Sequence, residues 1–129
     1  MRKNTCFFLI AVIIIITLIF STMSYFDRTL KKDTSELIIE IDNIISENKN
    51  NQKNFEKSKN LIELWENKLP KWSFIVHHSI IEKIDAGFIC FSETLKQGNT
   101  QSMVLEGEKL KSLLKIISEQ DELSLSNIL

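Results

Sequence analysis

Residues 6–20 read CFFLIAVIIIITLIF, and this apolar stretch decides the organisation of the chain. With its uncharged flanks it extends over residues 5–26, and Tyr25 and Phe26 stand where aromatic side chains anchor a helix at lipid headgroups. A helix of this length covers roughly 30 Å, the hydrocarbon thickness of a bilayer. The sequence therefore predicts one transmembrane anchor over residues 5–26, after a short cytoplasmic N-terminus at residues 1–4.

A cleavable signal peptide is the alternative interpretation of this stretch. Arg2 and Lys3 form a positively charged region before it, and Thr22 and Ser24 offer small side chains for a cut before Tyr25. However, the A-x-A pattern is absent and the apolar run is longer than is usual for a signal peptide. The sequence therefore favours an uncleaved anchor.

The orientation in the membrane depends on the basic residues that flank the anchor. Arg2 and Lys3 precede it, and Arg28, Lys31 and Lys32 follow it, so the two sides are nearly balanced. Only the second cluster is diluted by acidic residues, which are Asp27, Asp33, Glu36 and Glu40. We therefore expect the N-terminus in the cytoplasm and the bulk of the chain outside the cell membrane, with the reverse orientation left open.

The composition of the chain points to one small helical domain at residues 27–129. The formal net charge is -1 with both signs interspersed, so no nucleic-acid partner is expected. Glycine and proline are scarce, while Leu, Ile, Glu and Lys are abundant, which predicts an all-α fold. Cys6 lies in the apolar stretch and Cys90 on an apolar helix face, so we expect no disulfide and a buried Cys90.

The first soluble helix is predicted over residues 27–47, continuous with the anchor because no Gly or Pro interrupts it. The polar run NKNNQKN at residues 48–54 predicts a hairpin connection to the next helix. A heptad register continues across this run, so a single long coiled-coil helix is the alternative. Asn48, Asn51 and Ser58 would then lie in the seam, which favours the hairpin. The predicted core positions of the first helix are Leu30, Leu37, Ile41, Ile44 and Ile45.

A second helix is predicted over residues 55–68, and Pro70 should kink or end it. Residues 71–81, KWSFIVHHSII, are apolar nearly all round, which is typical of a deeply buried segment or of a surface that faces a partner. The core positions predicted for the second helix are Phe55, Ile62, Trp65 and Leu69.

A third helix should stop at Gly98, and Asn99 or Thr100 should cap a fourth. On the fourth helix, Gly107 would allow another helix to approach closely. The tail at residues 123–129 is too short for a sheet and is expected to pack on the bundle. Together these elements predict one N-terminal transmembrane helix followed by an up-and-down bundle of about four helices. The predicted core positions are Ile81, Ile84, Phe88, Phe91 and Leu95 in the third helix, and Met103, Gly107, Leu110, Leu114 and Ile117 in the fourth.

Several of these features together resemble a known family. They are Trp65, Trp72, His78 followed by Ile81 and Ile84-Asp85, a final amphipathic helix, and the terminal Asn127-Ile128-Leu129. Over nearly the whole chain the sequence resembles the bacterial "domain of unknown function 4363" family, small proteins of spore-forming bacteria with one N-terminal membrane segment. The resemblance implies a helical remainder, no established activity, and a multi-pass membrane partner of the YetF-like type. The chain departs from the family pattern at Pro70 and Ile80.

The side chains of His78 and Glu82 share a helix face, because they are four residues apart, and Asp85 follows one turn later. This spacing suits a structural histidine in the middle of the bundle, a pH-responsive pair or half of a metal site. His77 diverges from His78 by about 100°, so the two histidines do not grip one ion together. The structural interpretation is the expected one.

Trp65 and Trp72 are seven residues apart and therefore lie on one helix face. Core packing is the expected role of this pair, and an aromatic wall for a small ligand is the alternative. No nucleophile elbow or phosphate-binding glycine loop occurs in the sequence, so we expect no catalytic residue, metal or cofactor.

These observations predict a non-enzymatic, membrane-anchored bundle that binds or stabilises another membrane protein. The expected contact is the apolar surface of residues 72–78, with Phe74, Ile75 and Val76 exposed for the partner. The alternative is an extracytoplasmic module that senses a ligand or pH. Such a module would instead form a closed pocket lined by Trp65, Trp72 and His78.

Overall fold

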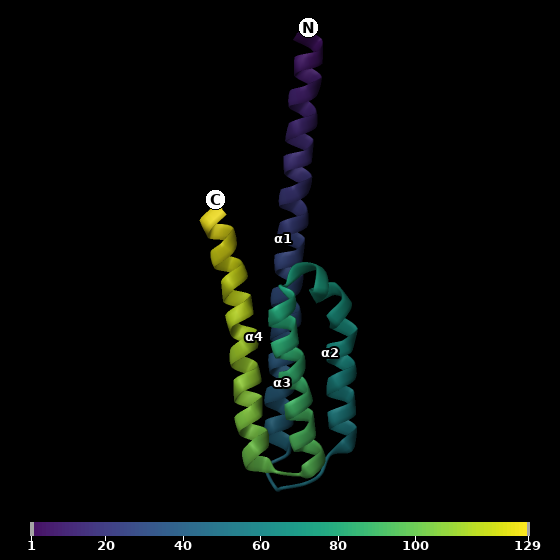
Figure 1. Ribbon diagram of the computed structural model, residues 1–129, viewed down its shortest axis with the longest axis vertical. Helices are drawn as coiled ribbons and strands as arrows, with labels where there is room; N and C mark the ends of the chain where they lie inside the picture. Colours follow the sequence, from purple (N-terminus) through teal and green to yellow (C-terminus); the bar gives the residue numbers. More distant parts are fainter. Residues whose placement is uncertain (1, 129) are drawn as a thin grey trace.

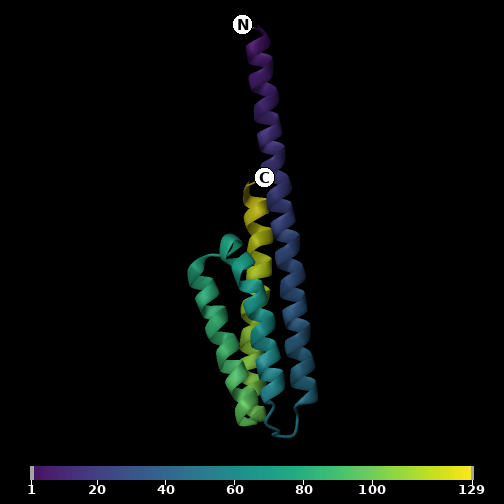
Figure 2. The ribbon, with the colours of Figure 1, turned by 90° about the vertical axis from the view of Figure 1, so that its right-hand side faces the viewer.

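The computed structural model describes the backbone of residues 2–128 and the side chains of residues 2–119. This part of the chain forms four helices and no strand. They are α1 (Arg2–Glu47), α2 (Phe55–Ile75), α3 (His78–Gln97) and α4 (Thr100–Ile128). The helices run alternately down and up, and α1 extends as a rod far beyond the other three (Figures 1 and 2). The all-α, up-and-down architecture with a long apolar N-terminal helix is thus confirmed.

Helix α1 joins the apolar stretch to the bundle without a break. Between residues 2 and 47 it contains neither Gly nor Pro, so nothing interrupts its hydrogen bonds. Its first buried residue is Leu30, and from there one face packs into the bundle. The predicted core positions Leu37, Ile41 and Ile44 are buried, and Ile45 is half-buried. The apolar stretch and the first bundle helix are therefore a single element.

The polar residues 48–54 form the connection between α1 and α2, which confirms the hairpin. Asn54 caps α2 by accepting a hydrogen bond from the Lys57 N–H over 3.0 Å. Asn51 has a left-handed backbone with φ 53° and pairs with Thr100. Its N–H donates to the Thr100 hydroxyl over 2.8 Å, and the Thr100 N–H donates to its side-chain oxygen over 3.1 Å. The loop is thereby tied to the start of α4, at the end of the bundle away from the N-terminus (Figure 1).

Helix α2 continues through Pro70, so the prediction that the helix stops near residue 68 was wrong. It ends at Ile75, after which the Val76 N–H donates to the Trp72 carbonyl over 2.8 Å. Proline deprives the carbonyl four residues earlier, that of Glu66, of its partner. Pro70 and Glu66 both lie on the exposed side of α2. The last part of α2 turns toward α3 (Figure 1).

The core face of α2 is rotated from the predicted one. Phe55, at the start of the helix, is exposed, and Ile62 and Leu69 are only half-buried. The Ser58 hydroxyl contacts the Ser92 hydroxyl of α3, and these small side chains let the two helices approach closely. The buried residues of α2 are Ser58, Leu61, Trp65 and Trp72.

Helices α3 and α4 bury the core positions predicted for them: Ile81, Ile84, Phe88, Phe91, Leu95, Met103, Gly107, Leu110, Leu114 and Ile117. Gly98 ends α3 in the left-handed conformation with φ 70°, and Asn99 caps α4 by accepting from the Ser102 N–H over 3.1 Å. Cys90 is exposed, so the prediction that it is buried was wrong. Its neighbours Phe88 and Phe91 occupy the core side of α3 instead. The backbone of the predicted tail continues α4 to Ile128, while the packing of its side chains lies outside the described residues.

Candidate functional site

The two tryptophans form an aromatic cluster inside the bundle. Trp65 and Trp72 are fully buried, and their rings meet edge to face with centroids 5.3 Å apart. The ring of Phe88 stacks on Trp65 at 4.9 Å. Such contacts add to the stabilisation from apolar burial. The two tryptophans therefore pack in the core of the bundle.

Each indole N–H is bonded to an aspartate on a neighbouring helix. Trp65 Nε1 donates to Asp85 over 2.9 Å, and Trp72 Nε1 donates to the buried carboxylate of Asp33 over 3.1 Å. The Lys71 ammonium lies 3.0 Å from the same Asp33 oxygen. The Lys68 ammonium, also largely buried, lies 3.4 Å from the other oxygen. These bonds join α2 to α1 and to α3.

The environment of Asp33 keeps it ionised. Burial alone raises the pKa of its carboxyl, but hydrogen bonds from Lys71 and Trp72 and the charge of Lys68 outweigh burial and hold that pKa below its usual value. We did not predict this cluster from the sequence. The available signal was the spacing, because Asp33 lies three residues after Leu30 and four before Leu37, within the buried face of α1.

The apolar residues 72–78 form the corner between α2 and α3, and they differ in how deeply they are buried. Trp72 is fully buried, Ile75 and Val76 are half-buried, and the Phe74 side chain is 89% exposed. His77 caps α3, since its Nδ1 accepts from the Ser79 N–H over 3.3 Å. This corner lies at the end of the bundle from which the apolar part of α1 emerges (Figures 1 and 2).

The predicted pair of His78 and Glu82 is formed, with 3.0 Å between Nε2 and Oε1. The two side chains are 84% and 68% exposed, so the expectation of a structural histidine in the middle of the bundle was wrong. His78 begins α3 at the corner instead. Asp85 does not join the pair, because it accepts from Trp65. Among the described residues, no group of three His, Cys, Asp or Glu side chains could hold a metal ion.

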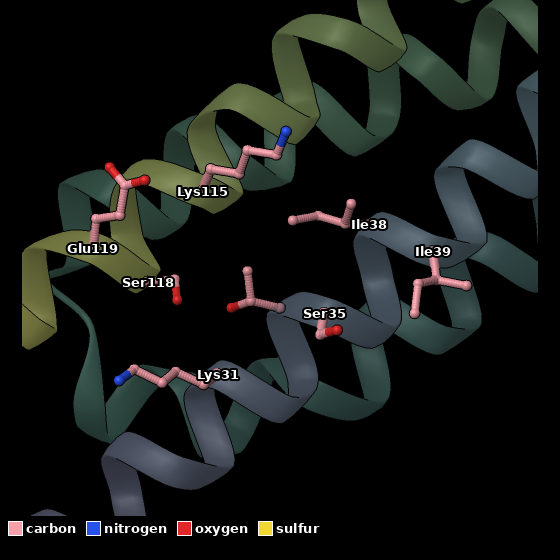
Figure 3. A pocket seen from close by; sticks show the side chains of 8 residues that line it. Lys31, Ser35, Ile38, Ile39, Lys115, Ser118 and Glu119 are labelled. Atoms are coloured by element: carbon pink, nitrogen blue, oxygen red, sulfur yellow. The ribbon is translucent and has the colours of Figure 1, made fainter.

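A groove between α1 and α4 is the second surface feature, and the sequence did not predict it. It encloses about 240 Å³ (Figure 3). Lys31 and Lys115 stand on its two sides, and Ile38 and Ile39 form its apolar part. Its remaining lining residues are Thr34, Ser35, Ser118 and Glu119. The groove is open to solvent and begins at Lys31, five residues beyond Phe26.

Comparison with models of protein families identifies the family of the chain. Residues 20–128 match the family described as Domain of unknown function (DUF4363). The chain belongs to this family. The match covers the bundle and the last part of the apolar stretch, so the core, the α2–α3 corner and the groove all belong to the DUF4363 region. No match was found among curated proteins or among solved structures.

The apolar part of this DUF4363 chain is exposed along its length. Helix α1 is long and apolar enough to cross a membrane, and none of its most apolar part is buried against the rest of the chain. Large side chains from Phe7 to Phe20 therefore have no partner within the bundle. A core helix of a soluble protein would be buried, so a membrane anchor and a signal sequence are the two functions that fit.

Proposed function

We propose that this chain is a single-pass membrane protein without enzymatic activity, whose bundle binds or stabilises another membrane protein. One observation carries the proposal: helix α1 leaves a fully exposed apolar segment and continues unbroken as a core helix of the bundle. A removable signal sequence has no need of such continuity. A stiff connection of this kind holds the bundle at a fixed height relative to the bilayer.

The buried and half-buried polar groups support a structural role for the interior. Asp33 and Asp85 accept from the two indoles, and Ser58 and Ser92 bond to each other. Each of these side chains is used to hold helices together. A site for chemistry would instead offer such groups to a cavity.

The partner surface that we propose is the groove between α1 and α4 with its apolar rim. Ile39 of α1 lines this groove and is exposed to water. The groove lies on the same helix that crosses the membrane, and its first lining residue is Lys31, five residues beyond Phe26 (Figure 3). A membrane protein that lies alongside α1 in the bilayer would therefore meet this groove where it emerges. The family resemblance makes a multi-pass protein of the YetF-like type the first partner to test.

The sensing alternative has one observation in its favour, the ion-pair geometry of His78 and Glu82. Both side chains point into solvent, so forming or breaking the pair changes no packed contact. The ligand version needed a pocket between Trp65 and Trp72, which pack directly against each other. The partner proposal is therefore the better supported.

The orientation that we propose places the N-terminus in the cytoplasm and the bundle on the other side of the cell membrane. Cys90 is exposed on α3 and serves as a native reporter. A membrane-impermeant maleimide should label Cys90 in intact cells, and Cys90→Ser should abolish that labelling. Labelling of Cys90 only after the cells are broken would establish the reverse orientation.

The partner proposal is tested by extracting the tagged full-length chain from its native membrane with mild detergent, and by co-expression with a YetF-like protein. We expect a stoichiometric membrane protein to co-purify and to be lost with Ile39→Glu. The control is Phe55→Glu, which places the same charge on an exposed apolar position at the far end of the bundle. A folded chain that purifies alone from its native membrane would overturn the proposal, as would equal recovery with both variants.

A further inference from the structure

Phe74 is the most exposed of the large apolar side chains that the structure describes. It lies near the end of α2 and is followed by Ile75 and Val76, which turn back into the bundle. Burial of a phenylalanine side chain away from water is favourable, so Phe74 would gain from an apolar environment. The role of Phe74 therefore depends on what surrounds its side chain when the protein is in the membrane.

Contacts between α1 and α2 fix the height of Phe74. Trp72 Nε1 bonds to Asp33 over 3.1 Å, so the two residues are level along the bundle. Phe26 is seven residues before Asp33, which is about 10 Å toward the membrane at 1.5 Å per residue. Phe74 is two residues beyond Trp72 on the antiparallel helix, about 3 Å in the same direction. Its backbone thus lies about 7 Å below the level of Phe26, within the thickness of a headgroup layer.

We infer that the α2–α3 corner touches the bilayer surface and that Phe74 inserts between the lipid headgroups. The inference rests on the proposed membrane insertion of α1. The phenyl ring reaches beyond the backbone and meets the boundary of the headgroups and acyl chains, where aromatic side chains are favoured. By the same count of 1.5 Å per residue, Lys71 of α2 and Arg28 and Lys32 of α1 lie within about 5 Å of the level of Phe74, and His77 is at the turn. These suit contact with anionic headgroups.

A second membrane contact has a structural consequence. Helix α1 alone would allow the bundle to tilt and to rotate about the helix axis. The corner lies on α2 and α3, to one side of α1 (Figure 2). Insertion of Phe74 therefore favours the tilt in which the side of the bundle formed by α2 and α3 approaches the membrane. The groove between α1 and α4 then faces sideways, parallel to the bilayer, where a membrane partner can reach it.

The test measures the depth of single positions in full-length protein reconstituted in nanodiscs of phosphatidylcholine and phosphatidylglycerol. In a Cys6→Ser, Cys90→Ser background, a fluorescent label is placed on Phe74→Cys, Tyr25→Cys or Phe55→Cys. A nitroxide-labelled lipid quenches labels that lie at the headgroup boundary. Tyr25 is at the predicted membrane boundary. Phe55 is an exposed phenylalanine of α2, the helix that carries Phe74, but it lies at the opposite end of the bundle.

We expect labels at positions 74 and 25 to be quenched several-fold more strongly than the label at position 55. Quenching at position 25 with none at position 74 would overturn the lipid contact and leave the anchor intact. No quenching at position 25 would instead overturn the membrane insertion on which the proposed function rests. A label at position 74 that is shielded from water in native membranes but is neither shielded nor quenched in nanodiscs would assign the corner to a protein partner. That result would also overturn the lipid contact.

Discussion

The indole nitrogen of Trp72 lies 3.1 Å from a carboxylate oxygen of Asp33, and this bond joins α2 to α1 just below the predicted membrane boundary. Both side chains are buried, and the charge of Asp33 is balanced by Lys68 and Lys71. Helices α1 and α2 contact each other less than the other neighbouring pairs do. The junction therefore depends on this polar cluster more than on close backbone packing.

Replacing Asp33 by Asn should weaken that junction. The amide keeps an acceptor for Trp72 but removes the charge that faces Lys68 and Lys71. We expect the free energy of unfolding to fall by about 1–2 kcal/mol, since hydrogen bonds to charged groups are worth about 1.5–3 kcal/mol. Urea unfolding of the full-length protein in mild detergent measures the change. Glu36→Gln is the control, because Glu36 is a half-exposed partner of Lys68 and its loss should cost less than about 0.5 kcal/mol.

The same cluster predicts a pH dependence. Because the pKa of Asp33 is lowered in the folded state, its ionised form stabilises the fold above the ordinary carboxyl pKa of about 3.9. That contribution is lost as the pH falls below this value toward the folded-state pKa. The stability difference between wild type and Asp33→Asn should therefore be constant near neutral pH and shrink below about pH 4. A difference that stays unchanged through the acid range would contradict the assignment.

Trp72 and Phe74 should behave in opposite ways when truncated. Trp72→Ala removes a fully buried ring and should cost on the order of 3 kcal/mol. Phe74→Ala removes an exposed ring and should change the stability by less than about 0.5 kcal/mol. Thermal unfolding followed by circular dichroism compares the two variants directly. Equal losses would mean that Phe74 packs within the bundle.

The sequence was enough to predict the helices, the loop at residues 48–54 and most of the core, because apolar periodicity and the Gly98 stop are local signals. It did not predict the burial of Ser58, because that depends on the matching Ser92 of α3. Nor did it predict the exposure of Cys90 and Phe55. An apolar residue at a helix end or beside the core stripe follows the same periodicity, and only the packing of the neighbouring helices decides its burial.

The candidate site was predicted less completely for a related reason. The spacing of His78 and Glu82 correctly placed them together, but periodicity alone could not tell that α3 begins at His78 and exposes the pair. The Asp33 cluster and the groove with Lys31 and Lys115 combine residues that are far apart in the sequence. Such combinations follow from the order of the helices in space.

Two glycines on helix faces offer a matched test of the packing. A Cβ at Gly107 would lie 2.7 Å from Ile45 Cδ1 and 2.9 Å from Phe91 Cε2. Overpacking of a core typically costs about 1–3 kcal/mol, and alanine recovers up to about 1 kcal/mol of helix propensity. Gly107→Ala should therefore be destabilising by about 1 kcal/mol. Gly87→Ala meets only the flexible end of Leu110 and should be nearly neutral, so equal stabilities would contradict the close packing at Gly107.

The stiffness of α1 can be tested with a spacer. Seven helix-forming residues inserted between Phe26 and Asp27 would lengthen α1 by about 10 Å and turn the bundle by only about 20°. Phe74 would then leave the headgroup layer while the face of the bundle stays the same. In the nanodisc experiment, quenching at position 74 should fall to the level of position 55, and quenching at position 25 should not change. The same insertion in the loop at residues 48–54, at the far end of the bundle, should leave quenching at position 74 intact. If position 74 remained quenched with the spacer in α1, the helix would have to bend at the membrane surface, and the fixed height on which both proposals depend would be wrong.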